Sequence, residues 1–151
     1  MVKFEIKVDE YSDDEAEEVY DTIISLIGNF DSSAGLLVGG SSSVHSGLKN
    51  SGASQEVLEN LEEVENILDD LTVEDIEELH DLFTNFLKGN GSKDDVSEKA
   101  DEIHEVFDES YNKYKDNVHD EVDNHGENNV AYALAILEEM KDESEELSGE
   151  F

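Results

Sequence analysis

The stretch from Ser54 to Leu87 reads SQEVLENLEEVENILDDLTVEDIEELHDLFTNFL and contains two sets of apolar residues at helical spacing. The first set recurs at alternating steps of four and three residues and consists of Val57, Leu61, Val64, Leu68 and Leu71. The second set consists of Ile76, Leu79, Leu82, Phe83, Phe86 and Leu87. Acidic residues are the commonest type at the remaining positions, which is the pattern of helices that bury one face.

A helix restart between these two sets is indicated by Thr72, which Asp75 follows at the spacing of a capping box. Two amphipathic helices with so short a link usually form an antiparallel hairpin in which the apolar faces meet. The sequence therefore predicts a helical hairpin at the centre of the fold.

The first part of the chain predicts a strand followed by a helix. Within Val2–Val8 the even positions are apolar and the odd positions are Lys, Glu and Lys, which is the period of a half-buried strand. Ser12 and Glu15 then have the spacing of a capping box, and a helical apolar stripe follows as far as Gly28 and Asn29. Leu36–Val38 is a candidate second strand that could pair with the first.

Two more helices are predicted in the second half of the chain. An apolar stripe runs from Val96 to Val118, and after a polar break at residues 123–126 a final helix contains Val130, Ala133, Leu134, Leu137 and Met140. Residues 144–151 are expected to form a frayed tail. We predict a single domain, residues 1–151, of the α+β class: mostly helical, with a small N-terminal β-sheet of two or three strands backed by four or five amphipathic helices.

The charge of the chain restricts its partners. The formal net charge is −33, from 42 acidic and 9 basic residues, and every basic residue is lysine. We expect such a chain to be repelled by anionic membranes and by nucleic acid phosphates. Cysteine is absent, so disulfides, thiol catalysis and zinc–thiolate sites are excluded. With no apolar run of about 18 residues and no signal peptide pattern, we expect a soluble protein of the cytoplasm or of a virion.

A nearly uncharged segment, residues 31–53, interrupts this acidic chain and is rich in Ser and Gly. One interpretation is a flexible connection. The other is a loop or strand that meets a partner where charge would be unfavourable. The candidate partner-binding residues are Leu36, Leu37, Val38, Gly39, Gly40, Ser41, Ser42, Ser43 and Val44.

Three histidines follow an acidic residue by three positions, in the pairs Glu77/His80, Asp101/His104 and Asp116/His119. Such pairs contribute to di-iron and di-manganese sites in helical bundles, which need two further carboxylates. Because acidic residues fill over a quarter of the chain, chance pairing on a solvated face is the favoured interpretation. The polar residues between His119 and Glu127 lack the spacing of a calcium-binding loop, and a helix C-terminal turn explains them better. We predict no metal and no cofactor.

Ser41, Ser42, Ser43 and His45 suggest nucleophilic catalysis, but the nucleophile-elbow pattern is missing. Glycine-rich phosphate-binding patterns are missing too. We therefore predict that the protein is not an enzyme.

Three explanations of the acidic surface remain: adaptation to molar salt, mimicry of nucleic acid, and a structural role in a larger assembly. Small viral inhibitors of restriction or CRISPR systems are similar in size and charge only. Our leading prediction is a non-enzymatic acidic protein-interaction or structural module, of the assembly or virion type, from a halophile or its virus, binding other proteins or copies of itself. The alternative is a DNA mimic that inhibits a basic DNA-binding protein, and a minor alternative is a di-metal carboxylate bundle.

Overall fold

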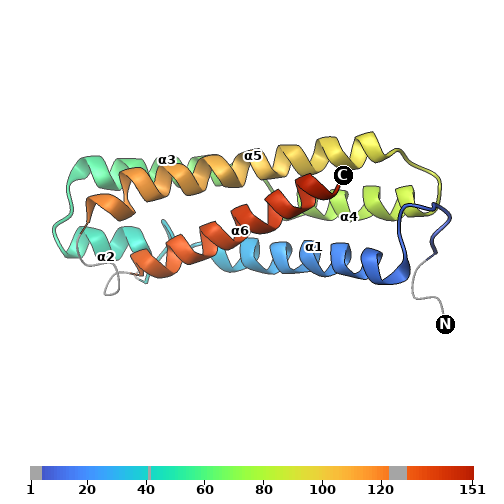
Figure 1. The fold of residues 1–151 in the computed structure, drawn as a ribbon. Helices are drawn as coiled ribbons and strands as arrows, with labels where there is room; N and C mark the ends of the chain where they lie inside the picture. Colours follow the sequence, from blue (N-terminus) through green and yellow to red (C-terminus); the bar gives the residue numbers. More distant parts are fainter. Residues whose placement is uncertain (1–4, 41, 123–128) are drawn as a thin grey trace.

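The computed structural model describes residues 5–40, 42–122 and 129–151. Within these ranges every regular element is a helix, and Figure 1 shows their arrangement. The helices are α1 (Asp13–Ser33), α2 (Val44–Asn50), α3 (Gln55–Asp69), α4 (Val73–Leu87), α5 (Lys93–Asn117), the short 3-10 helix η1 (His119–Glu121) and α6 (Val130–Glu150). The predicted α+β class with an N-terminal sheet is therefore wrong.

The two predicted strands cannot pair because α1 separates them. This helix has 21 residues, and at 1.5 Å per residue it is about 32 Å long. The described part of the first predicted strand lies before α1 and crosses the end of α4, where the Lys7 backbone N–H donates to the Leu87 carbonyl over 2.6 Å. Leu36–Val38 follows the opposite end of α1 and forms bends. Residues 2–4 of the first predicted strand lie outside the described residues.

The predicted hairpin of α3 and α4 is also wrong, because the two helices follow one another along α5 (Figure 1). Glu63 on α3 lies 2.8 Å from Lys113, and Glu78 on α4 lies 3.2 Å from Lys99. α3 therefore lies beside the C-terminal half of α5, and α4 lies beside its N-terminal half. The 25 residues of α5 are long enough to contact both helices. Leu71 in the link is buried like the apolar residues on either side of it.

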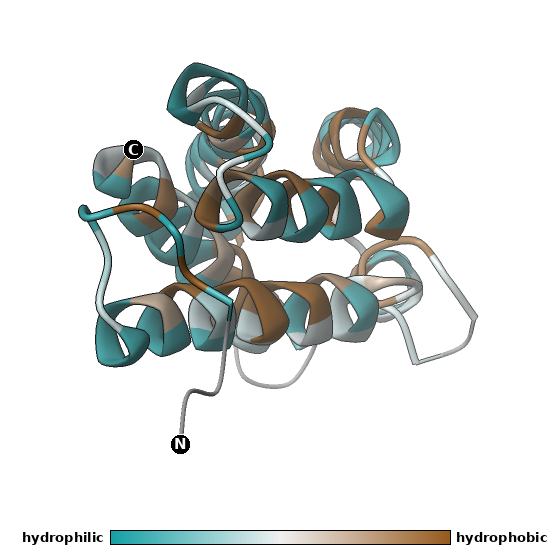
Figure 2. Ribbon diagram, turned by 90° about the vertical axis from the view of Figure 1, so that its right-hand side faces the viewer, coloured by the Kyte–Doolittle hydropathy of each residue, from teal (hydrophilic) through white to brown (hydrophobic). Residues whose placement is uncertain are grey.

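The helices form an antiparallel four-helix bundle. α1 with α2 forms its first arm and α3 with α4 its second, so each of these arms contains a break, and α5 and α6 form the other two. α6 packs against α5 and α1, and α1 also packs against α4. The short helix α2 packs against α3 beyond the end of α1 (Figure 1). Figure 2 shows hydrophobic residues mainly on the inward faces and hydrophilic residues outside. An apolar interior and a polar exterior are the usual organisation of a helical bundle.

Residues 144–150 continue α6 rather than forming a frayed tail, and two of them pack in the core. α6 continues to Glu150, and both Ser144 and Leu147 are buried. The Phe151 ring lies 5.5 Å from the ring of Phe83. Tyr11, before α1, packs edge-on against Phe83 at 5.3 Å, so the segment that precedes α1 and the residue that follows α6 meet on α4.

The starts of α1 and α4 were predicted correctly from their capping boxes, whereas α2, which Ser43 caps, was not predicted. Ser12 with Glu15, and Thr72 with Asp75, form the two predicted capping boxes. Ser92 caps α5 by accepting a hydrogen bond from the Asp95 backbone N–H. In the part of the chain that the structure describes, no helix is both long and apolar enough to cross a membrane.

Gly28 lies inside α1, which continues five residues beyond the predicted end. A Cβ atom at this position would meet no atom within 4 Å. Because glycine is a poorer helix former than alanine, we expect Gly28→Ala to raise the free energy of unfolding by about 0.5–1 kcal/mol. Urea denaturation would measure it. Gly149→Ala, near the end of α6, is the control, and an equal gain there would contradict a specific effect of the α1 interior.

Candidate partner-binding site

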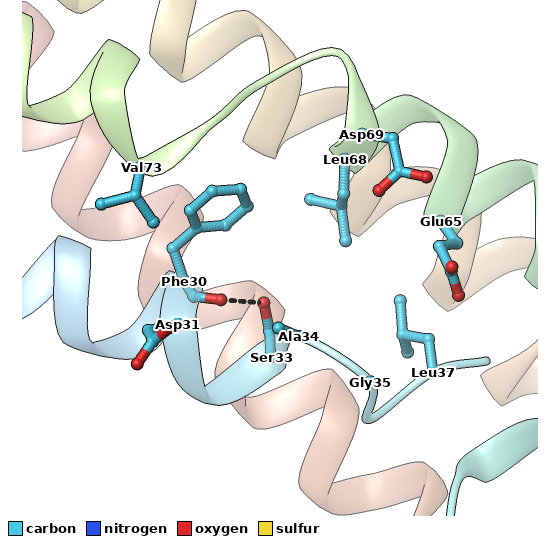
Figure 3. A pocket seen from close by; sticks show the side chains of 10 residues that line it. All are labelled: Phe30, Asp31, Ser33, Ala34, Gly35, Leu37, Glu65, Leu68, Asp69 and Val73. Carbon is cyan, nitrogen blue, oxygen red and sulfur yellow. Dashed lines mark hydrogen bonds between the residues drawn. The ribbon is translucent and has the colours of Figure 1, made fainter. Parts of the chain in front are cut away.

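Two helix breaks face one another in the bundle wall and leave a cavity of about 180 Å³ (Figure 3). The first break lies between α1 and α2, and the second between α3 and α4. The residues that line this break cavity are Phe30, Asp31, Ser33, Ala34, Gly35, Leu37, Glu65, Leu68, Asp69 and Val73. They come from the end of α1, the segment after it, the last two turns of α3 and the start of α4.

The walls of the break cavity are largely apolar. Figure 3 shows the Phe30 ring between Val73 and Leu68, with Leu37 on the opposite side below α3. Behind this wall, Phe30 packs edge-on against Phe107 with 5.7 Å between ring centroids. Phe30 is therefore held by the core while part of its side chain borders the cavity.

Carboxylates add negative charge to this apolar cavity. Glu65 and Asp69 are one turn apart on α3, and Asp31 lies in the last turn of α1. Neither helix has a basic residue in its last turn. Because a helix C-terminus carries about half a negative charge, both helix ends add to the negative potential here.

The Glu65 carboxyl responds to this setting. Partial burial raises its pKa above the ordinary value of 4.5, and the neighbouring charge of Asp69 raises the pKa further. A hydrogen bond from the Val38 backbone opposes both effects, as does His45. Glu65 on α3 therefore accepts a hydrogen bond from the segment that follows α1. Its ionised form is less favourable in the folded protein than in the unfolded chain.

We expect Glu65→Gln to raise the melting temperature at pH 7 but not at pH 4. A raised pKa in the folded state means that stability falls as pH rises from 4.5 through the folded-state pKa, because the folded protein there binds more protons. Glutamine removes this loss and keeps an oxygen that can accept from Val38. Thermal melts at both pH values would measure the difference. Glu59→Gln, on α3 away from the cavity, is the control, and an equal gain from it would contradict a local effect.

Residues 34–40 of the nearly uncharged segment form an ordered turn between α1 and α2. Gly35 adopts a φ of 77°, which only glycine takes up readily. A Cβ atom at Gly39 would collide with the Gly35 carbonyl, whereas one at Gly40 would meet nothing within 4 Å. The turn is closed by hydrogen bonds of 2.8 Å from Val44 N–H to the Leu36 carbonyl and from His45 N–H to the Leu37 carbonyl.

The predicted partner-binding residues divide by exposure. Leu37, Ser43 and Val44 are buried, and Leu36 and Val38 are half-buried. The exposed members are Gly39, Gly40 and Ser42, while Ser41 lies outside the described residues. The structure thus brings Leu37 to the break cavity and the glycines to the surface beside it.

A second hollow borders the same turn and shares Ala34 and Gly35 with the break cavity. It has a volume of about 420 Å³ and is lined by Ser32, Ala34, Gly35, Leu36, Gly40, Ser42 and Ser43. At this end of the molecule the Asn129 side-chain amide donates to the Ser42 carbonyl over 3.2 Å. Tyr132, three residues further on in α6, is 58% exposed. The uncharged turn is therefore bordered by two hollows, with an exposed aromatic ring less than one helical turn beyond Asn129.

The residues that sequence patterns missed are Phe30, Glu65 and Asp69. Phe30 lies beyond the predicted end of its helix, and the two acids resemble every other acid on α3. Only their position at the C-terminal end of α3 distinguishes these two acids. A helix C-terminus favours basic residues, and the last turn of α3 has none.

The three histidine pairs do not converge. The His80 ring packs on the Tyr20 ring at 4.9 Å, and His104 Nδ1 lies 3.1 Å from the Ser144 hydroxyl. His119 Nδ1 lies 3.0 Å from Asp120, a contact that lowers the pKa of the Asp120 carboxyl together with Lys115. Among the described residues no three acidic or histidine side chains are placed to hold a metal ion.

The remaining polar candidates have local roles or cannot be placed. Ser43 is the N-cap of α2 and accepts from the Ser46 backbone N–H over 3.1 Å. His45 Nε2 lies 3.5 Å from Glu62. Of the polar run between His119 and Glu127, residues 123–127 lie outside the described residues.

No family model, curated protein or solved structure matches this chain. The function is therefore argued from the break cavity and the surface around it.

Proposed function

We propose that this chain is a non-enzymatic, acidic protein-interaction module whose contact face includes the nearly uncharged segment 31–53. The observation that carries the proposal is the pair of hollows that border the ordered turn Ala34–Gly40, at the place where the acidic sequence becomes nearly neutral. A partner that docks on the turn covers few carboxylates outside the break cavity, and covering an ionised carboxylate without a partner group is unfavourable.

Exposed apolar groups support the same face. In the described part of the chain the exposed large hydrophobic side chains are Ile24 and Tyr132. Tyr132 follows Asn129, which is bonded to the uncharged segment, whereas Ile24 lies in the middle of α1. Tyrosine is enriched among the residues that contribute most to binding at protein interfaces. The contact face would therefore contain a neutral turn, two hollows and one exposed aromatic side chain.

A matched pair of glycine variants tests this proposal. Gly39→Ala forces the turn away from the Gly35 carbonyl, and we expect it to cost about 1–3 kcal/mol of stability and to weaken partner binding. Gly40→Ala adds the same methyl group next door, where nothing lies within 4 Å, and should bind normally. Partners captured from extracts of the source organism would be compared by their affinity for both variants. Unchanged affinity of a folded Gly39→Ala protein would refute the proposal.

The second candidate is a DNA mimic that occupies the basic groove of a DNA-binding protein. The observation in its favour is the density of charge on an elongated bundle (Figure 1). The 25 residues of α5 extend about 37 Å, and a duplex of that length carries about 22 phosphate charges. The net charge of −33 exceeds that number.

Competition with DNA separates the two candidates. A mimic would be displaced from its partner by a short duplex of any sequence, and its affinity would fall steeply between 0.05 and 0.5 M KCl. A module that binds through the nearly uncharged segment would not be displaced by duplex DNA, would lose less affinity than the mimic as KCl rises, and would respond to Gly39→Ala. Displacement by duplex DNA with an unaffected Gly39→Ala variant would favour the mimic.

A further inference from the structure

We infer that the break cavity receives a lysine side chain presented by a basic protein partner. This inference deepens the proposed function and rests on it, because it names the chemistry that the contact face recognises. It draws on the size of the cavity, its walls, its charge and the surface beside it.

The size and walls of the cavity suit the stem of a lysine. A volume of about 180 Å³ is close to that of a 150 Å³ protein cavity that holds one benzene molecule, so one side chain fits. Phe30, Leu68 and Val73 offer apolar surface on one side and Leu37 on the other (Figure 3). Lysine buries its four-carbon stem against such surfaces while its charged end stays with polar groups.

The charge of the cavity suits the ammonium group. Glu65 and Asp69 approach from α3, and the C-terminal ends of α1 and α3 add their partial negative charges. An ammonium group offers three hydrogen-bond donors to these carboxylates and carbonyls. A neutral or anionic side chain would leave the two acids in mutual repulsion.

The chain's own lysines do not serve this cavity in the described structure. Lys99 contacts Asp75, Glu78 and Glu102, and Lys113 contacts Glu63. No lysine is among the residues that line the cavity. None of the lysines in the described ranges therefore supplies the complementary charge, and we assign that charge to the partner.

The surroundings indicate a side chain carried by a peptide rather than a free small cation. The second hollow, beside Gly40 and Ser42, adjoins the break cavity through the shared residues Ala34 and Gly35. It is uncharged, and the exposed backbone there can pair with a peptide backbone next to the inserted lysine. A free ion would use neither this hollow nor the apolar walls.

The test is a titration of the full-length protein with the peptide acetyl-Gly-Gly-Lys-Gly-Gly-amide in 0.15 M KCl. Methyl NMR signals of Leu37, Leu68 and Val73 should shift in a saturable manner. The peptide with norleucine in place of lysine keeps the stem and loses the charge, and we expect it to bind at least about tenfold more weakly. Equal binding of the norleucine peptide would overturn the inference.

Two variants separate binding in the cavity from general attraction to an acidic protein. Glu65→Gln/Asp69→Asn should weaken lysine-peptide binding about tenfold, whereas the matched control Asp142→Asn/Glu145→Gln on α6 should change it less than about twofold. Val73→Trp fills the cavity without changing the charge and should abolish the methyl shifts of Leu37. Equal effects of the two charge variants, or full binding to Val73→Trp, would show only non-specific attraction and overturn the inference.

Failure of the lysine inference is distinguishable from failure of the proposed function. If a captured partner depends on the Gly39 turn but binds Glu65→Gln/Asp69→Asn normally, the contact face stands and the lysine site is wrong. If the partner ignores both changes, the contact face itself is wrong. Spermidine or magnesium chloride that displaced the lysine peptide from the cavity at micromolar concentration would point to a free cation and overturn the inference.

Discussion

Raising KCl from 0.05 M to 2 M is expected to increase the melting temperature of this protein by about 10–20 °C, which corresponds to a gain of about 5 kcal/mol for a chain of this length. The cause is the net charge of −33 on a folded bundle. Two like charges 10 Å apart repel by about 0.4 kcal/mol in water without screening. Many such pairs together approach the 5–15 kcal/mol by which folded domains are typically stable.

Salt acts on this repulsion because it shortens the range of charge interactions. The Debye length falls from about 10 Å at 0.1 M to about 3 Å at 1 M, which is less than the spacing of most surface carboxylates. The ion pairs that salt weakens are few: Lys113 with Glu63, Lys115 with Asp120, and Lys99 with its three acids are the main ones in the described structure. Exposed pairs contribute about 0–1 kcal/mol each, so the relief of repulsion outweighs their loss.

A variant with fewer exposed charges controls for other effects of salt. Glu105→Gln/Glu109→Gln/Glu138→Gln/Asp142→Asn removes four exposed acids from α5 and α6. Its melting temperature should be higher in dilute buffer and should rise less steeply with KCl. Thermal melts followed by circular dichroism would measure both. A melting temperature that stays constant or falls with KCl would contradict the expectation and would favour the DNA mimic, which must fold in dilute buffer.

The helices could be predicted from the sequence because their signals are local. Apolar spacing and caps such as Thr72 with Asp75 depend on residues within a few turns of one another. The pairing of helices is different. The short link at Asp70–Thr72 suggested a hairpin, but the length of α5, determined by residues 93–117, lets α3 and α4 lie along it in succession.

The predicted sheet failed for a related reason. Alternation of apolar and polar residues before α1 describes one extended segment, whereas a sheet requires a second segment at the same place. The candidate second strand, Leu36–Val38, follows α1 at its opposite end. The extended segment instead lays its apolar residues Ile6 and Val8 on the core.

The break cavity could be predicted in part. Both breaks are visible in the sequence, as a Ser/Gly-rich segment and as a capping box. That the two breaks lie side by side depends on the tertiary structure. The end of α1 and the link between α3 and α4 must lie at the same position along the bundle axis. Phe30 and Glu65 lie 35 positions apart, and no local pattern relates them.

Phe83→Ala is expected to lower the free energy of unfolding by about 3–5 kcal/mol, the usual cost of removing a buried aromatic ring. Phe83 is fully buried on α4 and lies within 5.2–5.5 Å of the rings of Tyr11, Tyr20 and Phe151. Its loss removes the ring against which Tyr11 and Phe151 pack, so the backbone amides of residues 148–151 should also lose hydrogen-exchange protection. Urea denaturation and hydrogen exchange would measure the two effects.

If Phe83→Ala does not fold, two milder variants test whether the C-terminal residues belong to the core. Phe151→Ala removes a half-buried ring from the same cluster and should cost about 1–2 kcal/mol, with the same loss of protection at the end of α6. Ile24→Ala truncates a side chain that is 59% exposed and should change stability by less than about 0.5 kcal/mol. If Phe151→Ala were as neutral as Ile24→Ala, the C-terminal residues would not be part of the core. The end of α6 would then be free to fray, and α1 and α4 would have to hold together without it.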